Sequence, residues 1–208
     1  MYKLPLALAL LLTPLPALSS TSTVDDLQSL VIDVVDVGAG LCTVLQAPSP
    51  EGKKIMVYDV GSSSCGSSIK EIIGSSEIDL VVISHPDADH YRGISKAFKP
   101  TSDGGYGLKT KAILETGIVR FSKDGSISPT YKKYINAKKS IPTTYSLTNT
   151  ETAELYKVGK QWGLGDAAVT FIHGHGQVPG QSDNKDPSSH DRNGASIVLK
   201  IEYGSNSI

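Results

Sequence analysis

Four side chains that can bind divalent metal ions stand within six consecutive positions of this sequence. They are His85, Asp87, Asp89 and His90, in the segment His-Pro-Asp-Ala-Asp-His. Imidazole nitrogens and carboxylate oxygens are ligands for zinc, manganese and iron. Two such ions held close together can share a bridging hydroxide and drive hydrolysis. The segment therefore predicts a metallohydrolase, and the alternative is an acidic loop in water.

The local geometry expected for this segment suits metal binding. It follows an apolar strand predicted over residues 78–84. Alternate residues of an extended segment point the same way, so His85, Asp87 and Asp89 can converge. His90 then turns in from the start of the next element.

Hydrophobic periodicity and turn residues predict the elements that position this segment. Strands are expected over 27–37, 41–46, 54–60, 78–84, 111–115, 167–172 and 195–203, and a hairpin loop over 48–52. Helices are expected over 67–73, 92–98, 131–138 and 148–160, and a long polar loop over 177–193. The last helix opens with a capping box of Thr148 and Glu151. Strands come first and helices then mix with them, which predicts a layered α/β (α+β) domain.

Composition indicates one domain behind an export signal. The chain has 208 residues, 39% of them hydrophobic, and a net charge of -1, which argues against a strongly basic nucleic-acid binder. Lys3, the apolar run 4–12 and small residues near Ser19 predict a signal peptide over 1–19, removed to leave a domain over 20–208. The run is too short to cross a bilayer as a stable helix. We therefore expect a secreted or periplasmic protein, and the alternative is a frayed apolar N-terminus or a membrane anchor.

The sequence contains two cysteines, Cys42 and Cys65. An even number of cysteines in an exported protein permits a disulfide, and the two flank neighbouring predicted strands. Two separate buried thiols are an equally good interpretation.

Four segments in this order resemble the metallo-β-lactamase fold superfamily. They are residues 34–40, 58–61, 85–90 and 193–200. The closest branch is the hydrolase domain of the ComEC-like competence proteins and their secreted relatives, and the resemblance runs from about residue 30 to the last residue. It implies an αββα sandwich with a metal site at one edge of the two sheets.

The resemblance also implies which residues bind two divalent ions. His85 and Asp87 would bind the first ion, with Asp87 in place of the second histidine of the commoner motif. Asp89 and His90 would bind the second ion and serve catalysis. Asp59, at the end of a strand, would support the site by hydrogen bonding.

A further ligand would come from the end of the strand predicted over 167–172. His175 or, alternatively, His173 would complete the site, and we favour His175 because glycines flank it. The metal would be zinc or, because a carboxylate replaces a histidine, manganese or iron.

Two features depart from the family pattern. Leu41 and Cys42 follow Gly40, where the family usually has an acidic residue. The family also continues to a metal-bridging aspartate and a later histidine, whereas this chain stops at Ile208. We therefore expect that the C-terminal part of the domain is missing.

These observations support two hypotheses of function. The first is an exported metal-dependent hydrolase in which a metal-bound hydroxide attacks a phosphodiester or other ester-type bond, in a small molecule or a nucleic acid. The second is a non-catalytic exported binding module or an inactive fragment of such a hydrolase. A basic cluster with interleaved tyrosines, over 131–139, predicts a solvated helix face or, alternatively, a nucleic-acid contact.

Overall fold

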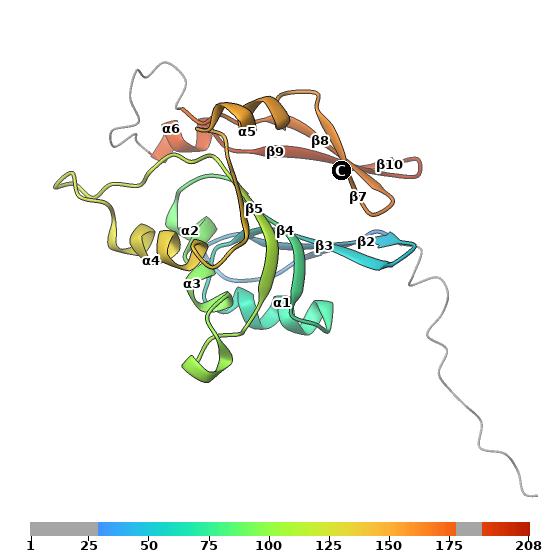
Figure 1. The fold of residues 1–208 in the computed structure, drawn as a ribbon, viewed down its shortest axis with the longest axis horizontal. Coiled ribbons are helices and arrows are strands. Elements are labelled where there is room, and N and C mark those ends of the chain that lie inside the picture. The colour runs from blue at the N-terminus through green and yellow to red at the C-terminus, as the bar shows by residue number, and fades with distance from the viewer. Residues whose placement is uncertain (1–28, 178–188) are drawn as a thin grey trace, which may run out of the picture.

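Two β-sheets lie face to face, and helices cover their outer sides (Figure 1). This computed structural model describes residues 29–177 and 189–208, without the side chains of 189 and 190. The predicted signal peptide, 1–19, and the start of the strand predicted over 27–37 lie outside the described residues. Among the residues described, no helix is both long and apolar enough to cross a membrane.

In the described part of the chain, the larger sheet has six strands in the order β1-β2-β3-β4-β5-β6. They are β1 (Val31–Val34), β2 (Cys42–Ser49), β3 (Gly52–Val60), β4 (Glu77–Ile83), β5 (Lys109–Glu115) and β6 (Thr143–Ser146). The first three strands are antiparallel neighbours, and the pairs from β3 to β6 are parallel. The last four residues of β4, 80–83, are all buried, as expected for a parallel strand covered on both faces.

Over the same residues, the smaller sheet has four antiparallel strands in the order β10-β9-β8-β7. They are β7 (Gln161–Leu164), β8 (Ala167–His173), β9 (Val198–Tyr203) and β10 (Asn206–Ser207). The helices are α1 (Cys65–Ile73), α2 (Ala88–Tyr91), α3 (Ile94–Ala97), α4 (Pro129–Lys138), α5 (Thr150–Leu155) and α6 (Ser189–Gly194). Figure 1 shows α1 to α4 outside the larger sheet, and α5 and α6 beside the smaller one. This arrangement confirms the layered α/β fold class.

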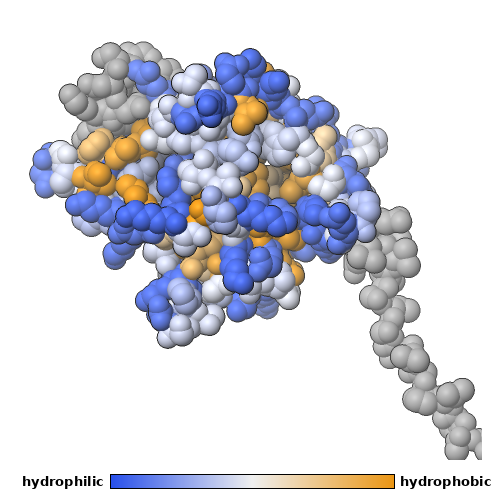
Figure 2. Space-filling view, viewed as in Figure 1, coloured by the Kyte–Doolittle hydropathy of each residue, from blue (hydrophilic) through white to orange (hydrophobic). Residues whose placement is uncertain are grey.

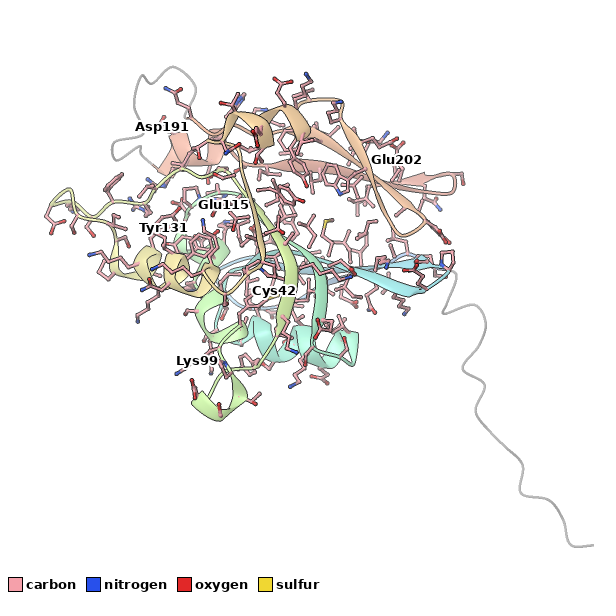
Figure 3. The ribbon with its side chains drawn as sticks, viewed as in Figure 1. Cys42, Lys99, Glu115, Tyr131, Asp191 and Glu202 are labelled. Atoms are coloured by element: carbon pink, nitrogen blue, oxygen red, sulfur yellow. A yellow bond between two sulfur atoms is a disulfide. The ribbon has the colours of Figure 1, made fainter. Side chains whose placement is uncertain are left out.

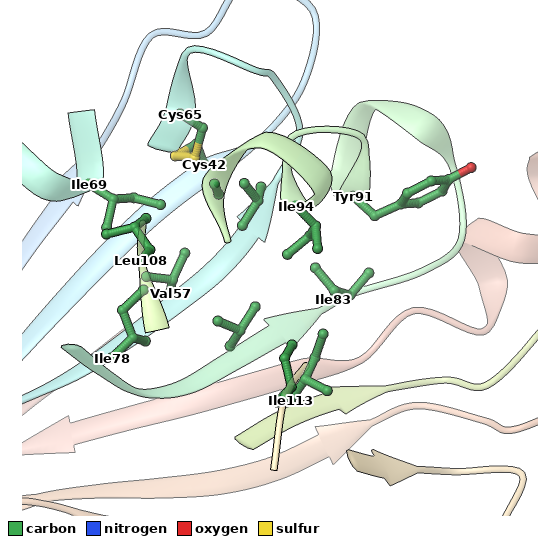
Figure 4. Packing of buried hydrophobic residues seen from close by; sticks show 14 of the residues in the cluster. Cys42, Val57, Cys65, Ile69, Ile78, Ile83, Tyr91, Ile94, Leu108 and Ile113 are labelled. Carbon is green, nitrogen blue, oxygen red and sulfur yellow. A yellow bond between two sulfur atoms is a disulfide. The ribbon is translucent and has the colours of Figure 1, made fainter. Parts of the chain in front are cut away.

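Each face of the larger sheet buries its own apolar core. Between the sheets, Met56 and Leu114 pack with Phe171 of β8. Under the helices, Ile69 of α1 and Ile94 of α3 belong to the other core (Figure 4). Complete burial of such a side chain contributes about 1.5–3 kcal/mol. The surface in Figure 2 is mostly hydrophilic, and hydrophobic residues show where the two layers meet.

Most predicted elements are present with shifted ends, but β6 and β7 were not predicted. Each is only four residues long. The burial of β6 does not alternate regularly, and β7 alternates over too few residues to predict a strand. β6 pairs with β5, which is distant in the sequence, whereas β7 pairs with β8 across the short turn between Leu164 and Ala167. The loop predicted over 177–193 also contains most of α6.

The helix predicted over 92–98 is present only as α3, over Ile94–Ala97, and a separate short helix, α2, ends at Tyr91 just before it. Gly93 lies between the two helices. A Cβ on Gly93 would lie 2.0 Å from the carbonyl oxygen of Ser62. The N–H of Gly93 donates a hydrogen bond to the carbonyl of Val60 at the end of β3. The chain therefore passes against the loop after β3, and only glycine allows this approach.

The predicted capping box of α5 is wrong. Asn149 is the N-cap, and its side chain accepts a hydrogen bond from the N–H of Thr152. The hydroxyl of Thr148 instead lies 2.8 Å from the hydroxyl of Ser146. The helix ends at Leu155, well before the predicted end at about residue 160.

The predicted basic cluster lies on α4, but its tyrosines are not on the surface. Tyr131 and Tyr134 are 4% and 2% exposed. The hydroxyl of Tyr134 donates to the buried carboxylate of Glu115, which also accepts from Lys138; Figure 3 shows Glu115 and Tyr131 in this region. Base stacking by these two tyrosines is therefore excluded.

Cys42 and Cys65 form a disulfide that joins the start of β2 to the start of α1. Their Cα atoms are 6.2 Å apart, and both residues are fully buried. The structure thus decides between the two interpretations of the cysteines in favour of the disulfide.

Reduction of this disulfide should lower the free energy of unfolding by about 3 kcal/mol, because the bridge closes a loop with a sequence separation of 23 residues. Urea unfolding of the oxidised and the reduced protein measures the difference. A double variant, Cys42→Ala with Cys65→Ala, should unfold at the same midpoint with and without reductant. Equal midpoints for oxidised and reduced wild-type protein would contradict the prediction.

Candidate metal centre

The predicted metal-binding segment lies where β3 and β4 end. The two strands are parallel neighbours, with Tyr58 opposite Val82. Asp59 and the segment 84–90 therefore leave the sheet at the same edge. Asp87 takes the N-cap position of α2 with an extended backbone, and the helix begins directly after it.

Asp59 is the centre of a hydrogen-bond network inside this segment. Its carboxylate is fully buried. It accepts hydrogen bonds from the backbone N–H and the hydroxyl of Ser84, both at 2.7 Å, and from Nδ1 of His90 at 2.6 Å. Because a carboxylate can only accept, Nδ1 of His90 must carry the hydrogen. The other nitrogen, Nε2, faces away from this bond, as in histidines that bind metals.

The surroundings of His90 are strongly acidic. Burial opposes its charged form, but the hydrogen bond and charge of Asp59, with the charges of Asp89 and Asp87, outweigh burial and raise the pKa of His90 above its ordinary value. A centre that stabilises a positive imidazole also attracts a cation.

The four predicted ligands approach one another in two pairs. Nε2 of His85 lies 3.7 Å from Oδ2 of Asp87, and Nε2 of His90 lies 3.7 Å from Oδ2 of Asp89. The two imidazole rings are 4.0 Å apart between centroids. Two ligands of one tetrahedral ion lie roughly 3.4 Å apart, so each pair has a spacing suited to sharing an ion. Within residues 29–177 and 189–208, however, no three such side chains are arranged around a common point.

The second ring nitrogen of His85 faces two serines. Nδ1 lies 3.0 Å from the hydroxyl of Ser84 and 3.2 Å from that of Ser196. The N–H of Ile197 donates to the carbonyl of Ser84 at 2.9 Å. The sequence motif over 193–200 therefore reaches the centre through Ser196, which the sequence did not identify as a site residue.

Two arginines lie against Asp87, and neither was predicted. Nε of Arg192, on α6, donates to Oδ1 of Asp87 at 2.5 Å, and Nε of Arg120 is 4.0 Å from the same oxygen. The side chain of Arg192 is 4% exposed and that of Arg120 is 33% exposed. The only sequence signal for Arg192 is its place directly before the motif over 193–200.

In the part of the chain that the structure describes, no hydrogen bond or ring contact joins His173 or His175 to the segment 84–90. Nε2 of His173 lies 2.9 Å from the carbonyl of Gly194, and the two histidine rings meet edge to face at 4.7 Å. Partial burial, and then the charge of His173, lower the pKa of His175. Their service as ligands stays a prediction.

The backbone of Asp89 packs against two glycine-containing turns, at residues 38–40 and at Gly61. The N–H of Leu41, after the predicted Gly-Ala-Gly turn, donates to the backbone carbonyl of Asp89 at 3.1 Å. A Cβ on Gly61 would lie 1.8 Å from that same oxygen. The side chain of Arg92 donates hydrogen bonds to the carbonyls of Gly61 and Ala39, and so links the two turns.

Comparison with known proteins gives likeness to solved structures alone. No family model and no curated protein matches the chain. The chain is similar to MEM-A1, a subclass B3 metallo-β-lactamase from a soil metagenome library, at 16% identity and a TM-score of 0.43 over 86% of this chain and 57% of that one. It is also similar to a Cronobacter sakazakii metallo-β-lactamase motif mutant, at 14% identity and a TM-score of 0.40 over 77% and 51%.

A third similar structure is the metallo-β-lactamase GOB-18 from Elizabethkingia meningoseptica, at 13% identity and a TM-score of 0.37 over 81% of this chain and 54% of that one. The chain thus spans about half the length of these enzymes. At such identities and TM-scores, the likeness says nothing of activity.

The variant Asp59→Asn should lower the free energy of unfolding by about 1–3 kcal/mol, because an amide presents one acceptor oxygen where three donors converge. Asparagine tolerates the left-handed backbone of Asp59, at φ 62°, so the loss comes from the hydrogen bonds. Urea unfolding measures it, and Asp36→Asn, at an exposed turn, is the matched control. Equal effects of the two substitutions would contradict the role of Asp59.

The variant Gly61→Ala should displace Asp89 and lower stability by about 1–3 kcal/mol, because the added methyl group has no room. Gly163→Ala is the control, since a Cβ there meets nothing closer than 3.6 Å. Urea unfolding compares the two. An unchanged midpoint for Gly61→Ala would show that the approach to Asp89 is not as close as described.

Proposed function

We propose that this chain is a metal-dependent hydrolase of the metallo-β-lactamase fold superfamily, from the ComEC-like branch. The observation that carries the proposal is the pairing of His85 with Asp87 and of His90 with Asp89, at 3.7 Å each. A bound divalent ion polarises a scissile bond and activates water. Because all four donors are nitrogen or oxygen, they suit zinc, manganese or iron, and the two carboxylates favour manganese and iron over zinc.

The residues around the pairs prepare them for this chemistry. Asp59 fixes the tautomer of His90, so that Nε2 is presented on the side of Asp89. Ser84 and Ser196 engage Nδ1 of His85 and leave its Nε2 on the side of Asp87. Holding donors in place before binding reduces the ordering that binding requires. We propose two ions, one at each pair.

The substrate we propose is a phosphodiester or another ester-type bond, in a small molecule or a nucleic acid. The guanidinium of Arg120 is a third exposed and lies next to Asp87. Guanidinium groups match phosphate oxygens in geometry and charge, which supports an anionic substrate at this edge of the sheets.

We propose that the protein is exported to the periplasm or the medium. The sequence pattern over 1–19 is that of a signal peptide. The disulfide between Cys42 and Cys65 supports this proposal, since such bonds persist in oxidising compartments.

A second candidate function is a binding module without catalysis. It is favoured by the contact of Arg192 with Asp87, together with the absence of a three-ligand group among the described residues. Such a protein would hold the fold and bind at most one ion.

Turnover of bis(4-nitrophenyl) phosphate tests the proposed hydrolase. The chelated full chain should be inactive, and added Mn²⁺, Fe²⁺ or Zn²⁺ should restore turnover. Asp89→Ala should lose more than about 100-fold, because loss of a metal ligand exceeds loss of an outer partner. Asp103→Ala, in an exposed 3-10 helix over Thr101–Asp103, should keep full activity. A folded chain that binds metal but shows no turnover with any of the three ions would favour the binding module.

A further inference from the structure

We propose that Arg192 and Arg120 make the two metal positions unequal, so that the pair of Asp89 and His90 fills first. The pair of His85 and Asp87 is then the weaker position. This inference rests on the proposed function, because it concerns the affinity of the same centre for its ions. It assigns both arginines a part in setting how many ions the centre holds at a given metal concentration.

The carboxylate of Asp87 already has positively charged neighbours. One of its oxygens, Oδ1, accepts from Nε of Arg192 at 2.5 Å and lies 4.0 Å from Nε of Arg120. The other oxygen, Oδ2, lies 3.7 Å from Nε2 of His85. The carboxylate is 13% exposed, so water screens these charges little. An ion at this pair therefore meets a carboxylate that already faces two positive guanidinium groups.

The pair of Asp89 and His90 has surroundings of the opposite charge. His90 lies between two carboxylates, with Nδ1 2.6 Å from Asp59 and Nε2 3.7 Å from Asp89. Among the residues that the structure describes, no lysine or arginine forms an ion pair with Asp59 or Asp89. A cation here meets two carboxylates that are not paired with a lysine or arginine side chain in the described part of the chain.

The charge of the arginines should produce a measurable difference in metal affinity between the two pairs. Each guanidinium is permanently charged and repels a divalent ion held by the neighbouring carboxylate. At separations of several ångströms and an intermediate dielectric, one such charge changes the affinity for a divalent ion by roughly tenfold or more. Arg192 also donates to one oxygen of Asp87, which makes that oxygen a weaker ligand for an ion.

The experiment is a Zn²⁺ titration of the full oxidised chain, in competition with a chromophoric chelator and with bound zinc counted by elemental analysis. The wild-type protein should show two classes of site whose affinities differ by roughly tenfold or more. Asp89→Asn should remove the tighter class, whereas Asp87→Asn should remove the weaker one. These two variants assign each class to its pair.

Variants of the arginines test the cause. Arg120→Met should strengthen the weaker class by roughly tenfold, and Arg120→Lys, which keeps the charge, should restore the wild-type value. Lys111→Met is the matched control for loss of one positive charge, because Lys111 pairs with Asp79 near the opposite ends of β4 and β5. Since Arg192 is buried, Arg192→Met can fail to fold, and Arg120 keeps the test decisive.

Two zinc sites of equal affinity would overturn the inference and leave the proposed function standing. The same holds if Asp87→Asn removes the tighter class, or if Arg120→Met changes zinc binding no more than Lys111→Met. A folded chain that binds no zinc, manganese or iron would overturn the proposed function, and the inference would fall with it.

Discussion

The candidate centre depends on one buried carboxylate, that of Asp59. A buried charge is very unfavourable unless hydrogen bonds satisfy it. All three donors to Asp59 come from the segment 84–90, namely the N–H and hydroxyl of Ser84 and Nδ1 of His90. Any movement of this segment would leave the charge without partners. The network therefore fixes His90 directly, and His85 through its bond to Ser84.

The disulfide and the glycine turns act on the same piece of chain from the other side. Leu41 binds the backbone of Asp89, and its neighbour Cys42 is joined to Cys65 at the start of α1. Gly61 donates its N–H to the carbonyl of Leu41 and packs directly against the carbonyl of Asp89. The loop after β3 is thus held at both ends while it supports the ligand. This explains why an apolar residue can stand at Leu41, since its backbone carries the contact.

The sequence allowed prediction of features that local pattern determines. The apolar run of β4 predicted that the segment 85–90 follows a strand end, and the structure has the segment there. What the sequence could not show was pairing between distant segments. β6 forms only against β5, and Arg192 reaches Asp87 across 105 positions of the chain. Tyr134 was expected on a solvated helix face, because the sequence does not show its hydrogen bond to Glu115 of β5.

Asp87 and Arg192 act as a pair, because the arginine satisfies part of the carboxylate. An imidazole at position 87 could offer only one lone pair, and a metal ion would use it. A carboxylate has two oxygens, so it can face His85 with one and accept from Arg192 with the other. The arginine satisfies the oxygen that a metal would leave over, and it does so from a nearly fully buried position. A carboxylate at position 87 therefore brings with it a requirement for a donor, and α6 supplies that donor from the segment directly before the motif over 193–200.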